Sequence, residues 1–213
     1  MRGRIRTVAV CVVALGLRPG FAAVQAVTFD FDTATPVLAT GQSLPLDQST
    51  GGVSAQFSGP FSVQTDGTAG IHLSAFSGKY LYPRTLAIDK LTIGFGRRLT
   101  GITLTFATAD FQQAEVPTTI QLTAYLGSTG TPAVGSATAH GTYGTDTMPE
   151  GTLAFDSAGQ PFDFVEIVIP PGPLVASNFL VDNVIVTPVL RPALPIRRHL
   201  ARAPSAVRPT LQP

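Results

Sequence analysis

The chain has 213 residues with 13 acidic and 14 basic side chains, a length that suits one domain with appendages. Its charges are unevenly placed, because residues 27–187 hold all 13 acids and five basic residues, whereas residues 188–213 hold five arginines and no acid. Nucleic acid is therefore excluded as a partner of the central region, since neutralising phosphates takes clustered Lys and Arg.

The first 26 residues have the layout of a secretory signal peptide. Arg2, Arg4 and Arg6 precede the apolar run TVAVCVVALGL, and the small-residue stretch FAAVQA follows it, so cleavage is expected after Ala26. The apolar run is shorter than the roughly 20 residues that span a bilayer; the alternative is a buried N-terminal helix or strand. Cys11, the only cysteine, lies in this run. The mature chain is thus expected outside the cytoplasm, secreted or at the cell surface, with no disulfide and no transmembrane segment.

Residues 27–187 alternate apolar and polar side chains with a period of two. In GITLTFAT, for example, Ile102, Leu104 and Phe106 fall on one face, and threonine and aliphatic residues fit such a half-buried, pleated surface. Clusters of Gly, Pro, Asp and Ser separate the segments. Besides GITLTFAT and TTIQLTAYLG, the expected strands are 27–32, 53–57, 61–65, 71–76, 79–82, 86–95, 134–142, 151–156, 162–169 and 179–187. Many short strands without a helical stripe predict an all-β fold, an antiparallel β-sandwich of the jelly-roll type.

The character of the sequence changes near residue 188. Residues 189–213 carry Pro and Arg throughout, and proline removes backbone donors and blocks helix continuation. The tail is therefore expected to be disordered. The expected organisation is a signal peptide (1–26), a β-sandwich domain (27–188) and a Pro/Arg-rich tail (189–213).

Motifs of several well-known catalytic sites are missing from the sequence. It contains no G-x-S-x-G turn and no H-E-x-x-H, and GFGRRL lacks the third glycine of a nucleotide loop. A non-catalytic protein is expected. The alternative is a secreted glycoside hydrolase or lyase that uses acidic residues, since glycosidases place two carboxylates across a cleft.

Four polar residues are candidate ligands of a metal ion. The segment VTFDFDT places Asp30 and Asp32 on one strand face, about 6–7 Å apart. Asp182 and Asn183 interrupt the apolar strand FLVDNVIV and would add oxygens if the last strand ran beside the first. Calcium suits such oxygen ligands. The alternative is a solvated strand face for the first pair and a β-bulge at the second pair, whose side chains bond nearby backbone.

Tyr80 and Tyr82 in KYLY share one strand face and could stack on sugar rings. Such a pair can equally pack in a core or along an edge. The chain contains no tryptophan, which offers the largest stacking face. A polysaccharide-binding surface at these tyrosines is one expectation, and a purely structural or adhesive module is the other.

The stretches VTFDFDT, KYLYP, LTIGFGRRLTGITLTFATAD, IQLTAYLGSTGTPAVGSATA, FDFVEIVI and FLVDNVIVTP follow one another over most of residues 27–188. Together they resemble the β-sandwich domain of exported bacterial proteins of the PEP-CTERM type, which is similar to galactose-binding-like jelly rolls. The resemblance implies that the first and last strands lie together. It also implies a structural calcium held by Asp30, Asp32 and Asp182, with Asn183 as a further ligand.

The chain departs from that family after the last strand. The family continues with Pro-Glu-Pro, an apolar helix and an arginine cluster, whereas this chain continues with LRPALPIRRHLARAP. No C-terminal anchor is recognisable, so the protein is either freely secreted or carries a tail from a shifted reading frame. The resulting expectation is a cell-surface or extracellular matrix component whose partner is polysaccharide or the cell envelope.

Overall fold

The computed structural model describes residues 25–67, 73–85, 90–110, 118–144, 148–171, 176 and 178–190. Within these ranges the chain forms strands and no helix, so none of the described residues forms a helix that could span a membrane. The strands are β1 (Val27–Phe29), β2 (Leu46–Thr50), β3 (Val53–Ser58), β4 (Phe61–Thr65), β5 (Lys79–Pro83), β6 (Lys90–Thr108), β7 (Thr119–Tyr125), β8 (Ala133–His140), β9 (Glu150–Asp156), β10 (Phe162–Val168) and β11 (Phe179–Pro188). The signal peptide and the tail expected from the sequence lie almost wholly outside the described residues.

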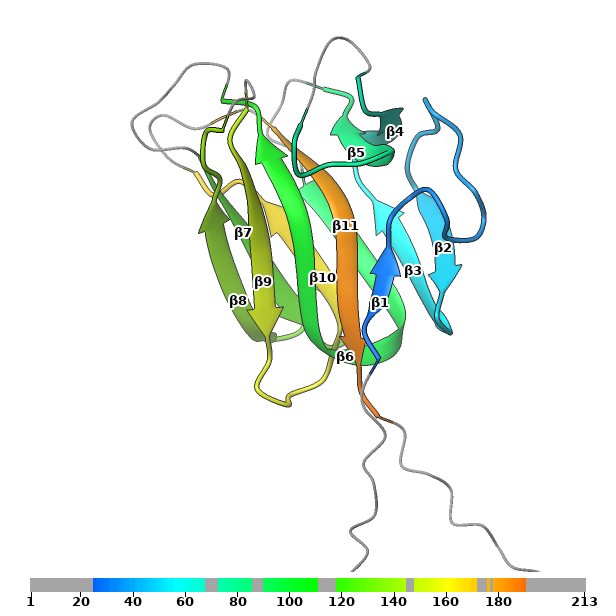
Figure 1. Ribbon diagram of the computed structural model, residues 1–213. Helices are drawn as coiled ribbons and strands as arrows, with labels where there is room; N and C mark the ends of the chain where they lie inside the picture. Colours follow the sequence, from blue (N-terminus) through cyan, green and yellow to red (C-terminus); the bar gives the residue numbers. More distant parts are fainter. Residues whose placement is uncertain are drawn as a thin grey trace, which may run out of the picture.

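The strands form two layers that share β6 (Figure 1). One layer, the β11 sheet, has the order β4–β5–β11–β6–β9, with β1 beside β11. The other, the β10 sheet, has the order β2–β3–β6–β10–β7–β8. The first half of β6 pairs with β3 and β10 and its second half with β9 and β11. Every pair is antiparallel, which confirms the predicted antiparallel β-sandwich.

Apolar side chains from both sheets fill the space between the layers. Phe29 of β1 meets Phe57 of β3 with ring centroids 5.9 Å apart. Phe155 of β9 meets Phe162 of β10 at 5.5 Å. Both pairs bridge the two sheets. Phe29, Phe57 and Phe162 are fully buried, and truncating such a ring costs about 3–5 kcal/mol. The alternation seen in the sequence therefore builds the core directly.

Most expected strands are present, and the differences have local causes. The described part of the strand predicted at 71–76 is a turn at residues 73–76, whose apolar residues bury in a second cluster on the outer face of the β11 sheet. The strand predicted at 27–32 ends at Phe29. The separate strands predicted at 86–95 and 101–108 are one strand, β6, within the described range 90–108.

Strand β2 was not predicted, because its inward face carries a glutamine. Gln48 is 1% exposed, and neither its amide nitrogen nor its amide oxygen has a hydrogen-bond partner among the described residues. The segment LDQST therefore lacks the apolar alternation that marks the other strands. Pairing with β3 along its whole length fixes it as a strand nonetheless.

Candidate functional site

The predicted metal residues lie at the junction where β1 ends beside β11. The two strands are antiparallel neighbours, with Phe29 opposite Val184, so the first and last strands do lie together. The pairing of β11 with β6 shifts between Asp182 and Ile185, which marks a β-bulge. Asn183 in this bulge has a φ of 49°, a left-handed conformation that Asn tolerates better than most residues. The polar pair in the apolar strand thus builds the bulge.

Asp182 is a buried carboxylate, 0% exposed, that accepts three hydrogen bonds. Ser77 N donates to Oδ2 at 3.1 Å. Asn183 donates its backbone N to Oδ1 at 2.7 Å and its Nδ2 to Oδ2 at 2.9 Å. Burial raises the pKa of Asp182 to about 6; the hydrogen bonds from Ser77 and Asn183 oppose this rise, and the charges of Asp32 and Asp30 add to it. An ionised carboxylate here is costly unless a positive charge compensates it.

Asp32 binds the same backbone segment as Asp182. Lys79 N donates to Asp32 Oδ2 at 3.0 Å, two residues after the amide that binds Asp182. Lys79 Nζ lies 3.6 Å from Asp32 Oδ1. Gly78, between the two amides, has a φ of 64°, and a Cβ there would collide with the Asp32 carboxylate. The close approach of Asp32 to this segment therefore requires glycine at position 78.

Asp30 closes a turn of its own. Its Oδ1 accepts hydrogen bonds from Asp32 N at 3.1 Å and Thr33 N at 2.8 Å, and its Oδ2 accepts one from Thr33 Oγ1 at 2.6 Å. Partial burial raises the pKa of Asp30, but the hydrogen bonds from Thr33 and Asp32 outweigh it and leave that pKa below its usual value. Phe31 has a φ of 60°, so the chain has already left the strand. The predicted strand face carrying Asp30 and Asp32 is therefore wrong.

A third carboxylate holds the same loop. Glu150 of β9 accepts hydrogen bonds from Ser74 N at 3.1 Å and Ala75 N at 3.2 Å. Together with Asp32 and Asp182 it anchors residues 74–79 through their backbone amides. Residues 74, 75 and 77 are exposed, so their amides could otherwise bind water, and the carboxylates hold them in one position instead. The acids of this region thus replace strand pairing and fix the loop over the second apolar cluster.

A calcium ion at the β1–β11 junction would have to share the predicted ligands with hydrogen bonds that the protein already makes. In the described part of the chain no group of three or more His, Cys, Asp or Glu side chains could hold a metal ion. Asp30 and Asp182 each accept hydrogen bonds on both carboxylate oxygens, and Asn183 turns its amide nitrogen toward Asp182. Asp32 accepts one hydrogen bond on Oδ2, and its Oδ1 lies 3.6 Å from Lys79 Nζ. Backbone carbonyls or water would have to supply most of the six to eight oxygens that calcium takes.

Tyr80 and Tyr82 lie on the outer face of β5, but Tyr80 offers no ring to a ligand. It is 1% exposed and meets Phe76 edge to face, with ring centroids 5.5 Å apart. Burial raises the pKa of Tyr80, and the charges of Asp66 and Tyr82 add to the rise. Tyr82 is half-buried against the same cluster. The prediction that Tyr80 stacks on a sugar is wrong, whereas that for Tyr82 stays a prediction.

A groove of about 380 Å³ lies on the outer face of the β10 sheet. The strand register places Gln56 of β3, Gly94 of β6 and Phe164 of β10 in one row across the sheet. Tyr125 of β7 continues this row beyond Phe164. The two aromatic rings are 6.4 Å apart at an angle of 61°, and both residues are half-buried. We call the groove that contains Gln56, Gly94 and Phe164 the outer groove; Tyr125 lies beside it.

Glycine leaves room beside the aromatic ring of the outer groove. A Cβ at Gly94 would lie 3.7 Å from Phe164 Cδ2, so any longer side chain there would fill the space next to the ring. Two residues further along β6, a Cβ at Gly96 would collide with Ser54 Oγ. The floor of the outer groove is therefore backbone, which lets a ligand approach the sheet closely.

Two carboxylates flank the outer groove. Asp47 Oδ1 accepts a hydrogen bond from Gln56 Nε2 at 3.1 Å, and Asp163 Oδ1 accepts one from Gly127 N at 2.6 Å. The second oxygen of each carboxylate has no hydrogen-bond partner within the described ranges. Such oxygens accept hydrogen bonds from hydroxyl groups, while an exposed ring offers an apolar face. This combination suits a ligand that is apolar on one face and rich in hydroxyls at its edges.

The sequence did not point to Phe164 in the outer groove or to Tyr125 beside it, for different reasons. Tyr125 follows Thr119, Gln121 and Thr123 on the polar face of its strand, and an aromatic ring on a polar face is a usable signal. Phe164 gave no such signal, because Phe162 two residues earlier is buried in the core. A break in the pairing register between these phenylalanines turns them to opposite sides.

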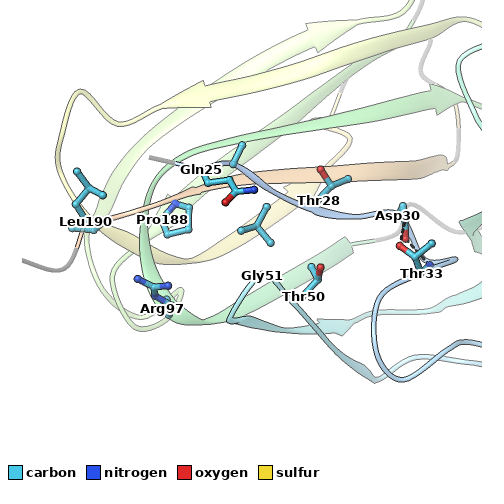
Figure 2. Close-up of a pocket in the computed structure, with 12 residues that line it drawn as sticks. Gln25, Thr28, Asp30, Thr33, Thr50, Gly51, Arg97, Pro188 and Leu190 are labelled. Atoms are coloured by element: carbon cyan, nitrogen blue, oxygen red, sulfur yellow. Dashed lines mark hydrogen bonds between the residues drawn. The ribbon is translucent and has the colours of Figure 1, made fainter. Parts of the chain in front are cut away.

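A second cavity, of about 430 Å³, opens between β1 and the turn that joins β2 to β3 (Figure 2). Arg97 lies at one end, the turn at residues 30–33 at the other, and Thr28 and Thr50 between them. Residues 25–26 form part of its wall. Cleavage after residue 26, as expected from the sequence, would remove that part of the wall. The shape of this cavity therefore depends on residues 25–26, which the mature protein is expected to lack.

Comparisons with known proteins return remote structural similarities. No protein-family model and no curated protein sequence matches the chain. Among solved structures, the module CsCBM6-3 from Clostridium stercorarium in complex with cellobiose is 13% identical, with a TM-score of 0.37, covering 62% of this chain and 87% of that one. A carbohydrate-binding module of Cellvibrio mixtus lichenase 5A with cellotriose has a TM-score of 0.34 at 13% identity, covering 62% and 88%. The xylan-binding module CBM86 from Roseburia intestinalis has a TM-score of 0.31 at 12% identity, covering 76% and 94%. The assignment of the β-sandwich rests on the strand pairing of this chain itself.

Proposed function

We propose that this protein is a secreted, non-catalytic β-sandwich that binds polysaccharide in the outer groove, as a component of the cell surface or extracellular matrix. The observation that carries the proposal is the row of Gln56, Gly94, Phe164 and Tyr125 across the β10 sheet. A sugar ring has an apolar face that packs on an aromatic ring. Its hydroxyl groups can donate to carboxylate and amide oxygens at the rim.

Binding at the ring of Phe164 is testable by truncation. Phe164→Ala removes the half-buried ring and is expected to weaken binding by about threefold to tenfold. Fully burying an exposed aromatic side chain contributes about 1.5–3 kcal/mol, a ligand can cover only the exposed part of this ring, and 1.4 kcal/mol is a factor of ten. Xylan and mixed-linkage β-glucan, the latter a relative of the cello-oligosaccharides bound by the structural neighbours, are suitable probes for affinity electrophoresis and calorimetry.

Tyr82→Ala is the comparison for Phe164→Ala, because Tyr82 is a half-buried aromatic residue outside the outer groove and the alternative sugar-stacking residue. It is expected to leave the affinity unchanged. Loss of binding in Tyr82→Ala with retention in Phe164→Ala would move the site to β5. Release of reducing sugars during incubation with either polymer would favour the glycoside hydrolase instead.

A structural calcium at the β1–β11 junction is part of the proposal. Its support is the fully buried Asp182 next to Asp32, two acids whose mutual repulsion a cation would relieve. Calcium at a hundredfold excess over its dissociation constant would stabilise the fold by about 2.7 kcal/mol. The measurement is the melting temperature with calcium and with chelator, for the wild type and for Asp182→Asn. Equal melting temperatures of the wild type in both conditions would reject the calcium site and leave the outer groove untouched.

A further inference from the structure

The outer groove is lined by hydrogen-bond acceptors on both sides. Asp47 stands at the β2–β3 side and Asp163 at the β10 side, and each carboxylate has one oxygen without a partner within the described ranges. One N–H of the Gln56 side-chain amide is donated to Asp47, which leaves its other N–H and its oxygen for a ligand. The polar groups that the groove offers are therefore mainly acceptors.

Positive charge is missing from the groove lining. Its lining residues include no Lys, Arg or His. Lys90 lies four residues before Gly94 on β6, outside the groove lining. Its Nζ is 3.0 Å from Glu166 Oε2, so that ammonium is paired locally. The surrounding domain is acidic as well, since residues 27–187 hold 13 acids and five basic residues.

We infer that the outer groove selects neutral, hydroxyl-rich glycan chains and rejects anionic ones; this rests on the proposed function and names its ligand class. Hydroxyl groups donate to the free oxygens of Asp47 and Asp163. A uronate or sulfate group in the same position brings a second negative charge to acceptors that cannot donate. Like charges at close range are repelled, most strongly at low ionic strength.

The test compares polymers that differ only in charge. Mixed-linkage β-glucan is paired with the same glucan after oxidation of its primary alcohols to carboxylates, and neutral arabinoxylan is paired with glucuronoxylan. Binding is measured at low and high salt, with chelator present so that divalent cations cannot bridge. The neutral member of a pair is expected to bind at least tenfold more tightly at low salt, and the difference is expected to shrink at high salt.

Two variants separate charge from stacking. Asp47→Asn with Asp163→Asn keeps an oxygen at each position but removes both charges, so the preference for the neutral polymer is expected to fall at least threefold. Phe164→Ala is expected to weaken both members of a pair equally. Unequal weakening would contradict the division of roles between the ring and the acids.

The outcomes distinguish this inference from the proposed function. If no polymer of either kind binds, the proposed function fails. If binding is lost in Phe164→Ala but the anionic member binds as well as the neutral one, the function stands and the selectivity is overturned. Anionic binding that appears only on adding calcium also overturns it, because the carboxylates would then act as a cation bridge.

Discussion

Asp182 at the β1–β11 junction and Asp163 beside the outer groove are both aspartates on strands, yet the fold surrounds them differently. Asp182 is fully buried and its carboxylate accepts hydrogen bonds from two backbone amides and one side-chain amide. Asp163 is partly exposed and accepts one hydrogen bond, from Gly127 N. The first carboxylate is committed to the protein's own backbone, whereas the second keeps an oxygen for a ligand.

The aromatic residues divide in the same way. Tyr80 is buried in a cluster with Leu73, Phe76, Met148 and Leu180. Phe164 is half-buried and lies beside Gly94, which has no side chain to cover the ring. Spacing in the sequence does not separate these cases, since Tyr80 and Phe164 each lie two residues from another aromatic residue. What separates them is whether another part of the chain covers the outer face of the sheet.

The largest expected effect on stability is that of truncating Tyr80, which should far exceed the effect of truncating Phe164. Tyr80→Ala is expected to lower the free energy of unfolding by about 3–5 kcal/mol, because it leaves a cavity in a closed cluster. Phe164→Ala is expected to lower it by less than about 1.5 kcal/mol, since its ring is partly in water. Urea unfolding of both variants is the measurement. An unchanged free energy of unfolding in Tyr80→Ala would mean that residues 73–76 do not cover the ring in solution.

The next effect concerns the buried charge of Asp182. Its folded-state pKa of about 6 lies above the usual 3.8, so the folded protein binds this proton more tightly than the unfolded chain. The contribution of Asp182 to stability is therefore fully present below pH 4 and is lost as the pH rises to 6. The shift of about two pKa units corresponds to about 3 kcal/mol.

Comparison with Asp182→Asn isolates this group from other carboxylates that titrate in the same range. The free energies of unfolding of the two proteins are measured between pH 4 and 7 with chelator, and the wild type is expected to lose about 3 kcal/mol relative to the variant. Saturating calcium is expected to abolish that loss if the proposed site exists. A constant difference across the range would mean that a positive charge already compensates Asp182.

The pairing of the first strand with the last was expected from the family resemblance and not from residue spacing. Alternation of apolar residues was enough to predict most strands of the core. It failed where backbone geometry departs from a strand without a change in spacing. The segment VTFDFDT alternates through Phe31, yet the chain turns after Phe29 because Asp30 captures the amides of Asp32 and Thr33. Phe31 reaches the core by a left-handed backbone conformation rather than by strand alternation.

The outer groove depended on features that a single sequence does not report. A register shift turns Phe164 outward and Phe162 inward. The row that joins Gln56, Gly94 and Tyr125 exists only once three separate strand pairings are known. The polar pair Asp182–Asn183 was the more visible signal, because a charge inside an apolar strand stands out, and it marked a structural bulge.

The smallest expected effects on stability are those of replacing Asp30, in the turn at residues 30–33, and Asp163, beside the outer groove. Asp30→Ala removes three hydrogen bonds within the turn at residues 30–33, and a typical intramolecular hydrogen bond contributes only about 1 kcal/mol net. Because the amides of an exposed turn can rebind water, the loss is expected to total about 1 kcal/mol.

Asp163→Ala removes one exposed hydrogen bond and is expected to change stability by less than about 0.5 kcal/mol, while it weakens polysaccharide binding. Thermal unfolding and affinity electrophoresis of both variants give the two readouts. A reversed pattern, with binding lost in Asp30→Ala and stability lost in Asp163→Ala, would place the ligand near the cavity between β1 and the β2–β3 turn and assign the outer groove a structural role.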